Sequence, residues 1–494
     1  MSLSKKTIAV FLLMVLCILF LSPLALSKEQ KHFVLLLRMM DRQHRWFRKN
    51  IIAPFEKNHD VHVATVPFDR FWDLEVILRL ERDSSNHATG LVKVPLEMTR
   101  PLKDFMIPYD DLMGKEELEV LKSQYDTKAL AMGTISQKLY YIPRKLETRT
   151  MIYLKSKTDE AVKGWKAFEA QIDGALKDDN GCGLPAGYDL EKDPNLWDYY
   201  DLFVVSYYWA HTPYYGIKMP RMAHRAKKYG GTVAGLVDRI YQMGGSPKDV
   251  VNISASHVVD MFVWEAVYKK HGLYHPGMWQ DPWSGGGIWN AMKDGKVFLA
   301  MMHQLDSFFI HGGTHAHMQG YLANPDDMRV ALMPKGVSFD LDSKGSPLRI
   351  GTRKAGTAGW WWGIPKTAPH PSLSVALANW ITNYDNHLAE CEIFGMMPIR
   401  KDILTNLQEA FPSGWMAHVF NVSMRQLEVN GNTTIPLLLE YPEIGRVYLN
   451  AWYDIVVAED YGKRGKVDRD YIRKKLDRVY APQVKEVLGN RYPK

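Results

Sequence analysis

The chain has 494 residues, of which 46% are hydrophobic and 24% are charged, and its formal net charge is +7. This composition is that of an ordinary globular protein, so it excludes a disordered, collagen-like or coiled-coil chain. The small positive charge is spread over a long chain and gives no indication of nucleic acid as a partner.

The first 27 residues follow the pattern of a secretory signal peptide. Two lysines precede an apolar run from Ile8 to Leu21, and the small residues Ala25 and Ser27 stand just before the expected cleavage point. The alternative is an uncleaved membrane anchor, since the run approaches the shortest length that spans a bilayer. With either outcome we expect the protein to lie in the periplasm.

Strand and helix patterns alternate where the mature chain begins. Strands are predicted at Phe33–Met40, Val61–Val66 and Leu91–Leu96, and helices at Asp41–His59 and Phe71–Arg82. This alternation predicts a parallel sheet with helices on its faces. Ligands of such sheets bind outside the carboxyl ends of the strands.

The rest of the chain is predicted to be mainly helical, with a few buried strands. The expected strands are Leu139–Pro143, Val297–Met302 and Val330–Met333. The expected helices are Trp165–Leu176, most of Leu196–Trp264, Ile288–Lys293, Ser372–Tyr384 and Pro442–Leu488. Pro334–Gly359 mixes glycine, proline and charge, which is typical of a loop or linker.

The sequence offers no motif for covalent catalysis. A nucleophile elbow, a phosphate loop, an HExxH zinc motif and a supported GxGxxG are all absent, so we predict no catalytic residue and no cofactor. His303, His311, His315 and His317 lie close together, and neighbouring histidines can share a metal. No Cys, Asp or Glu stands at a recognised metal spacing beside them, so we predict polar loop histidines near a cleft and no metal ligand. A secreted metal-dependent enzyme is the alternative.

Three consecutive tryptophans, Trp360, Trp361 and Trp362, stand out in the second half of the chain. Neighbouring residues of a strand point to opposite faces, so we expect at least one of the three to face a cleft or a partner. A tryptophan face suits the C–H face of a sugar ring or a cation. The alternative is an aromatic core strand. The same two interpretations apply to Tyr208, Trp209, Trp283 and Phe308, together with their aromatic neighbours Tyr207, Trp279 and Phe309.

Six segments together resemble the extracellular solute-binding proteins, family 1, of ABC importers, and the carbohydrate-binding members are closest in pattern. They follow the family's order along nearly all of the mature chain. The segments are Phe55-Glu56-Lys57, Leu139–Pro143 with Ile152–Lys155, Gly164–Phe168, Lys293–Lys296 with Ala300-Met301, Gly359–Lys366 and Gly395–Asp402.

The resemblance implies the two-lobe periplasmic-binding-protein fold of type II. Each lobe would be a mostly parallel α/β sheet flanked by helices, and a hinge would join the two. The N-terminal lobe would comprise residues 28–147 and 350–405, and the C-terminal lobe residues 148–349 and 406–494. The ligand would lie between the lobes, where pockets commonly form.

The resemblance also implies the residues that would hold the ligand. Glu97 and Glu147 would accept hydrogen bonds from sugar hydroxyls, although a salt bridge between the lobes is the alternative role for both. Aromatic side chains would form the walls of the site. The candidates are Tyr208 or Trp209, Phe308, Trp360 and Trp361, with Trp283 as a weaker one.

The function implied is capture of a sugar or oligosaccharide and its delivery to the transmembrane subunits of an ABC permease. The protein would act as a monomer, without covalent chemistry. Three alternatives stay open: a non-sugar solute such as a polyol, a polyamine, a metal chelate or a phosphodiester; a ligand-loaded sensor; and the secreted enzyme named above. The sequence does not say whether Cys182 and Cys391 form a disulfide.

Overall fold

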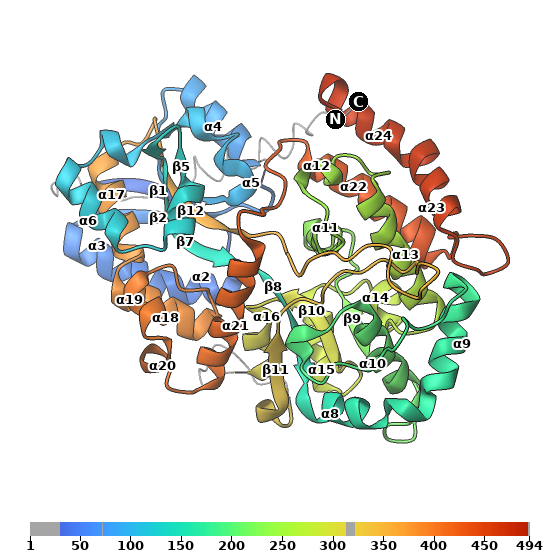
Figure 1. Ribbon diagram of the computed structural model, residues 1–494. Helices are drawn as coiled ribbons and strands as arrows, with labels where there is room; N and C mark the ends of the chain where they lie inside the picture. Colours follow the sequence, from blue (N-terminus) through green and yellow to red (C-terminus); the bar gives the residue numbers. More distant parts are fainter. Residues whose placement is uncertain (1–29, 72, 313–321, 493–494) are drawn as a thin grey trace.

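Two β-sheets divide the molecule into two lobes, seen left and right in Figure 1. The computed structural model describes residues 30–71, 73–312 and 322–492. The predicted signal peptide lies outside these ranges. Within them, none of the helices combines the length and the apolar character needed to cross a membrane.

The first sheet has the strand order β2-β1-β3-β12-β4, and β7 also pairs with β12. Its parallel strands are β1 (Lys31–Leu37), β2 (Val61–Pro67) and β3 (Thr89–Pro95). The strands β12 (Ala358–Pro365), β4 (Met106–Ile107) and β7 (Tyr141–Glu147) continue the sheet antiparallel to their neighbours. The three parallel strands predicted at the start of the chain are therefore confirmed, with ends shifted by a few residues.

The first long helical segment shows how local sequence sets the fold of this lobe. It runs without a break through α2 (Asp41–Phe47), a π-helical turn at Arg48–Ile52 and α3 (Ala53–His59). Its apolar side chains at Phe47, Ile51, Ile52 and Phe55 are buried. The segment ends at Asp60, which adopts the left-handed conformation (φ 48°) that aspartate tolerates better than most residues.

The remaining helices of the first lobe are shorter. They are α4 (Asp73–Asp83), α5 (Leu96–Thr99), α6 (Lys115–Ser123), α7 (Thr127–Gly133), α17 (Pro371–Ile381), α18 (Tyr384–Phe394), α19 (Lys401–Thr405) and α20 (Leu407–Ala410).

The second sheet has the order β11-β8-β10-β9. Its strands are β8 (Arg149–Leu154), β9 (Met222–His224), β10 (Leu299–His303) and β11 (Met328–Ala331). Strands β9 and β10 are parallel, while β8 is antiparallel to both β10 and β11. The predicted strands at 297–302 and 330–333 match β10 and β11 closely.

Helices dominate the second lobe, as predicted. They are α8 (Lys155–Gly164), α9 (Glu169–Asn180), α10 (Tyr199–His211), α11 (Gly230–Gln242), α12 (Pro247–Val250), α13 (Ser256–Lys270), α14 (Gly277–Gln280), α15 (Gly285–Lys293), α16 (Asp306–His311), α22 (Tyr441–Trp452), α23 (Arg469–Lys475) and α24 (Ala481–Leu488). Helix α21 (Trp415–Asn430) lies between the two lobes (Figure 1). Helix α13 is buried over most of its length, which explains why its sequence is apolar on all sides.

Three chain passages meet between the sheets. Thr148 joins β7 to β8, Thr357 leads into β12, and Asn430 ends α21, which lies between the lobes in Figure 1. Asn430 Nδ2 donates to Thr148 Oγ1 at 3.0 Å and to Thr357 Oγ1 at 3.4 Å, while its Oδ1 accepts from the Ala355 N–H at 2.8 Å. We propose that the chain changes lobe at these three places and that Asn430 ties them together.

The tryptophan run of β12 is more deeply buried than the sequence suggests. Trp361 and Trp362 are both fully buried, and Trp360 is 8% exposed. Trp361 Nε1 donates to the Ala129 carbonyl of α7, whereas the Trp362 ring stacks on Phe47 of α2. Helices cover both faces of this sheet, so residues that point in opposite directions can all be buried. Trp361 and Trp362 therefore belong to the aromatic core strand given as the alternative, and Trp360 is the one of the three that stays a candidate to face a ligand.

Candidate functional site

The carboxyl ends of the parallel strands in the first lobe gather charged and aromatic side chains at one edge. Arg38 follows the last residue of β1, and Glu97 lies just beyond β3 in the first turn of α5. Trp360 pairs with Pro95 at the end of β3, and Glu147 is the last residue of β7. This edge is where an α/β sheet places its ligand.

The second sheet presents a matching edge. Strands β9 and β10 are parallel, and Arg225 follows the end of β9 while His303 is the last residue of β10. Arg149, the first residue of β8, pairs with His303 across the antiparallel ladder. Its guanidinium lies 3.4 Å from His303 Nε2.

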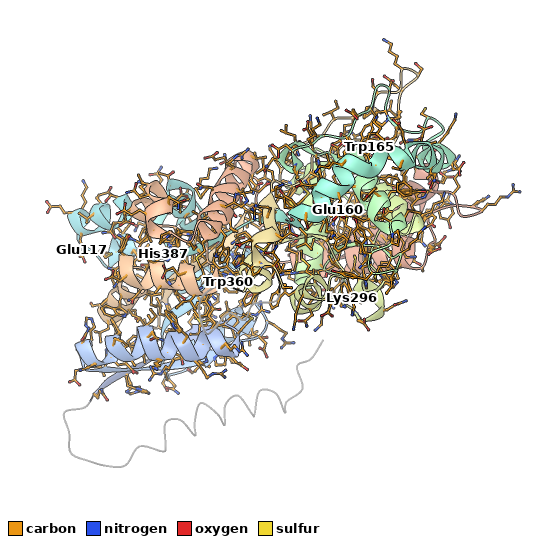
Figure 2. All side chains as sticks on the ribbon, turned by 90° about the horizontal axis from the view of Figure 1, so that it is seen from below. Glu117, Glu160, Trp165, Lys296, Trp360 and His387 are labelled. Atoms are coloured by element: carbon orange, nitrogen blue, oxygen red, sulfur yellow. The ribbon has the colours of Figure 1, made fainter. Side chains whose placement is uncertain are left out.

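Electrostatic interactions show that the two edges face each other. Burial raises the pKa of Glu97 to about 7, and the charges of Arg38 and Arg149 oppose that rise. Arg149 belongs to the second lobe and Glu97 to the first. In Figure 2 Trp360 lies in the first lobe, nearer to the second lobe than Glu117 and His387 are.

Glu147 is an ionised carboxylate held by positive neighbours. Its Oε1 lies 2.5 Å from Lys145 Nζ, on the same strand. Burial alone would raise the pKa of Glu147, but the charge of Lys145 and its hydrogen bond bring that pKa below the ordinary range of a glutamate. The salt bridge of Glu147 is thus made within the first lobe.

Glu97 differs from Glu147 because no ion pair holds it within the described ranges. A folded-state pKa raised from 4.5 to about 7 means that ionising Glu97 destabilises the fold. The stability contributed by the protonated carboxyl is complete below the unfolded pKa and is lost as the pH rises through the folded pKa.

We therefore predict that Glu97→Gln abolishes the loss of stability that ionisation of this carboxyl causes as the pH rises. At pH 8 the variant should be more stable than the wild type by up to about 3 kcal/mol, whereas at pH 4 the two should be equal. Urea unfolding at both pH values measures the difference. An identical pH dependence in the two proteins would refute the raised pKa.

Trp360 is the aromatic side chain at this edge. Lys93 Nζ lies 4.3 Å from the centre of its ring, and Phe71 meets it edge-on with centroids 5.5 Å apart. Arg38 lies over the Phe71 ring at 4.9 Å. These cation–π and edge-to-face contacts fix the orientation of the indole beside the two glutamates.

Three of the predicted aromatic contacts are core residues. Trp209 is fully buried and donates through Nε1 to the Lys157 carbonyl at 2.9 Å. Phe308 is fully buried against Trp415, and Trp361 is held by α7 as described above. Because other residues cover the surfaces of these three side chains, we do not carry them into the proposed site; the Phe308 ring also lies against Gly395 of the first lobe.

The other two predicted aromatic contacts also pack elsewhere. Tyr208, half-buried on α10, meets Phe168 edge-on with centroids 5.7 Å apart. Trp283 stacks on His275 at 4.7 Å in the second lobe. Thus only Glu97, Glu147 and Trp360, of the eight predicted residues, are brought together at the carboxyl edge of the first sheet.

Sequence reasoning missed the basic side chains of the second lobe as ligand candidates. Arg149 and Arg225 belong to no motif, and His303 was expected to be a polar loop histidine near a cleft, not a ligand contact. Applying the strand-end rule to the second sheet would have found His303, which follows the predicted strand Val297–Met302, but not Arg225, because the strand before it has only three residues. Tyr441, whose buried hydroxyl makes no hydrogen bond within the described chain, lies near Arg149 and Glu97 and was missed as well.

The structure describes two of the four clustered histidines and both cysteines that follow the predicted signal peptide. His311 stacks on Trp415 with centroids 3.7 Å apart, while His315 and His317 lie outside the described residues. Residues 30–71, 73–312 and 322–492 contain no group of three or more His, Cys, Asp or Glu side chains placed to hold a metal ion. Cys182 is exposed and Cys391 is buried, and both are free thiols.

Comparison with known proteins identifies the family. A model of the bacterial extracellular solute-binding proteins matches residues 50–413, well over half of the chain. The chain belongs to this family. No curated protein matches it in sequence. The family resemblance predicted from the six segments is confirmed, and so is the extracellular solute-binding class.

Several solved structures of solute-binding proteins share the fold at low sequence identity. Maltose-bound MalE3 of T. maritima has a TM-score of 0.63 and 16% identity, and the match covers 90% of this chain and 99% of that one. The Thermotoga lettingae ABC transporter solute-binding protein with α-D-tagatose has a TM-score of 0.59 and 15% identity, over 93% and 100%. MalE of Listeria monocytogenes with maltose has a TM-score of 0.55 and 16% identity, over 94% and 100%. The predicted two-lobe periplasmic-binding-protein fold is confirmed.

Proposed function

We propose that this protein is the extracytoplasmic solute-binding component of an ABC importer and that it holds a carbohydrate between its two lobes. The observation that carries the proposal is the meeting of the two carboxyl edges, with Glu97, Glu147 and Trp360 on one side and Arg149 and His303 on the other. The family supports the binding of a solute. Structures of the same fold with maltose and tagatose support a carbohydrate.

In the proposed complex each lobe supplies a different part of the site. The carboxylates of Glu97 and Glu147 accept hydrogen bonds from sugar hydroxyls, and the indole of Trp360 covers a C–H face of the ring. Arg149 donates from the second lobe. A solute that touches both lobes binds the closed state more tightly than the open one and so shifts the protein towards closure.

The transport role follows from closure. The closed, loaded protein would dock on the permease, and ATP hydrolysis would take place on another subunit. The chain itself would act as a monomer, without cofactor or covalent chemistry. We propose that residues 1–27 direct its export to the periplasm.

Replacing Trp360 by alanine tests the site. We expect Trp360→Ala to weaken carbohydrate binding by about 1–3 kcal/mol, which is about 5- to 150-fold, because a buried aromatic anchor is lost. A thermal-shift panel of sugars, oligosaccharides, polyols and polyamines first finds the solute, and calorimetry then measures its affinity.

Trp283→Ala is the matched control for this experiment. It removes a partly buried tryptophan that stacks on His275 outside the proposed site, so affinity should stay within about twofold. Equal losses in the two variants, or none in Trp360→Ala, would remove Trp360 from the site. If polyamines alone stabilise the protein, the proposal that its solute is a carbohydrate is refuted.

A further inference from the structure

A small cavity opens in the second lobe beside the proposed site. Its volume is about 10 Å³, which is room for about one water molecule or one oxygen atom of a ligand. Its walls come from the carboxyl ends of β9 and β10, the start of β8 and the first turns of α11. The lining residues are Arg149, His224, Arg225, Gly231, Gly235, Met301, Met302 and His303.

Two arginines of the cavity are held in place by buried carboxylates. Arg149 Nε lies 3.1 Å from Asp238 Oδ2, and Arg225 Nη2 lies 2.5 Å from Asp306 Oδ2. Both aspartates are fully buried. Arg149 Nη1 also donates to the Gly356 carbonyl, and its Nη2 lies 3.4 Å from His303 Nε2, so the guanidinium donor that stays unpaired within the described residues is Arg225 Nε.

Unsatisfied polar atoms remain on the cavity wall. Arg225 Nε and His303 Nδ1 are buried and make no hydrogen bond with any part of the chain that the structure describes. A buried polar atom without a partner costs about 1–3 kcal/mol, so such atoms indicate that something else binds there. Two unpaired nitrogens beside two guanidiniums suit a ligand that accepts hydrogen bonds.

Helix α11 points its first turn at the same place. The Tyr229 carbonyl accepts from the N–H groups of Thr232 and Val233, but the first residues of a helix have no carbonyl in a preceding turn. Gly231 is among these first residues and lines the cavity. The amino end of a helix of 13 residues carries partial positive charge, which favours anions.

The charged side chains around the cavity are paired. Arg149 and Arg225 each lie against a buried aspartate, and Glu147 lies against Lys145. Burial, together with Arg149 and Arg225, holds the pKa of His303 well below its usual value, so the imidazole is neutral and its unpaired nitrogen is free to donate. The preference for an oxyanion is therefore argued from the unpaired N–H donors and the amino end of α11.

We propose that this cavity binds an oxyanion group of the solute, so that the carbohydrate carried by this protein is an acidic one. The carboxylate, phosphate or sulfate of the sugar would accept hydrogen bonds from Arg225, His303 and the amino end of α11. Its hydroxyls would reach Glu97 and Glu147 across the site. This inference rests on the proposed function and narrows the class of solute.

Calorimetry with matched sugar pairs tests the inference. The full mature chain is titrated at constant ionic strength with glucuronate against glucose, galacturonate against galactose, and their trimers, and with glucose 6-phosphate and glucose 6-sulfate. We expect at least one acidic sugar to bind 10-fold or more tightly than its neutral partner. Comparison of the sugars that carry a carboxylate, a phosphate or a sulfate identifies which oxyanion the cavity prefers.

Two variants test whether the cavity causes the preference for the acidic sugar. Arg225→Gln should weaken binding of the acidic sugar at least 10-fold and lower the ratio of its affinity to that of the neutral partner by a similar factor. Lys474→Gln removes one positive charge from the exposed face of α23 and should change neither affinity. Should Arg225→Gln fail to fold, as judged by circular dichroism, His303→Gln takes its place with the same expected loss.

Each contrary result has a distinct meaning. Neutral sugars that bind as tightly as acidic ones would overturn the inference and leave the proposed function intact. A preference for acidic sugars that survives both Arg225→Gln and His303→Gln would also overturn it. Absence of binding by every sugar in the panel would overturn the inference and the carbohydrate proposal together.

Discussion

Trp361→Ala should lower the free energy of unfolding by about 3–5 kcal/mol and leave solute affinity unchanged. The side chain is fully buried between β12 and α7, and its indole N–H is bonded to the Ala129 carbonyl, so truncation leaves a cavity and an unpaired acceptor. Trp360→Ala should show the reverse pattern, with its larger effect on affinity. Urea unfolding measures the stability of each variant, and calorimetry measures its affinity for the solute.

This pair of neighbouring tryptophans tests which face of β12 serves the ligand. Both substitutions remove the same atoms from adjacent positions of one strand. Loss of affinity in Trp361→Ala, without a comparable loss in Trp360→Ala, would mean that the ligand lies on the α7 side of the sheet and would contradict the proposed site.

A comparable loss of stability is expected for Arg144→Met. Arg144 and Glu390 form an ion pair inside the first lobe, and neither side chain is exposed at all. Removing the arginine leaves the Glu390 carboxylate buried without its partner, which should cost about 3–5 kcal/mol. The measurement is urea unfolding at pH 7.

The double variant Arg144→Met/Glu390→Met completes this experiment. It removes both charges and fills the space with apolar atoms, so it should recover most of the stability lost in the single variant. A double-mutant cycle compares the stability of the wild type, the two single variants and the double variant. A double variant less stable than Arg144→Met would show that the two residues stabilise the lobe independently rather than as a pair.

Local patterns predicted much of the fold. The alternation over 33–96 predicted the parallel strands, because their side chains are buried on both faces and read as apolar runs. The apolar spacing over 41–59 predicted one helix, and the structure keeps it continuous through a π-helical turn. The resemblance of six short segments added the two-lobe arrangement, which no single segment indicates.

The site was predicted only in part, because burial depends on contacts far away in the chain. Trp361 is covered by residue 129 and Phe308 by Trp415, and neither partner can be recognised from the tryptophan or phenylalanine itself. Arg225 follows a strand of three residues, too short to give a pattern. Glu97 and Glu147 were predicted because the family resemblance aligns them with ligand contacts.

Small-angle X-ray scattering of the full mature chain, with and without the carbohydrate identified by calorimetry, tests most directly whether the solute is clamped between the lobes. We predict a smaller radius of gyration with the solute bound, since contact with both lobes favours closure. We also expect Trp360→Ala to need more solute for the same change. A radius of gyration that stays the same at saturating solute would contradict the clamp and place the ligand on a single lobe.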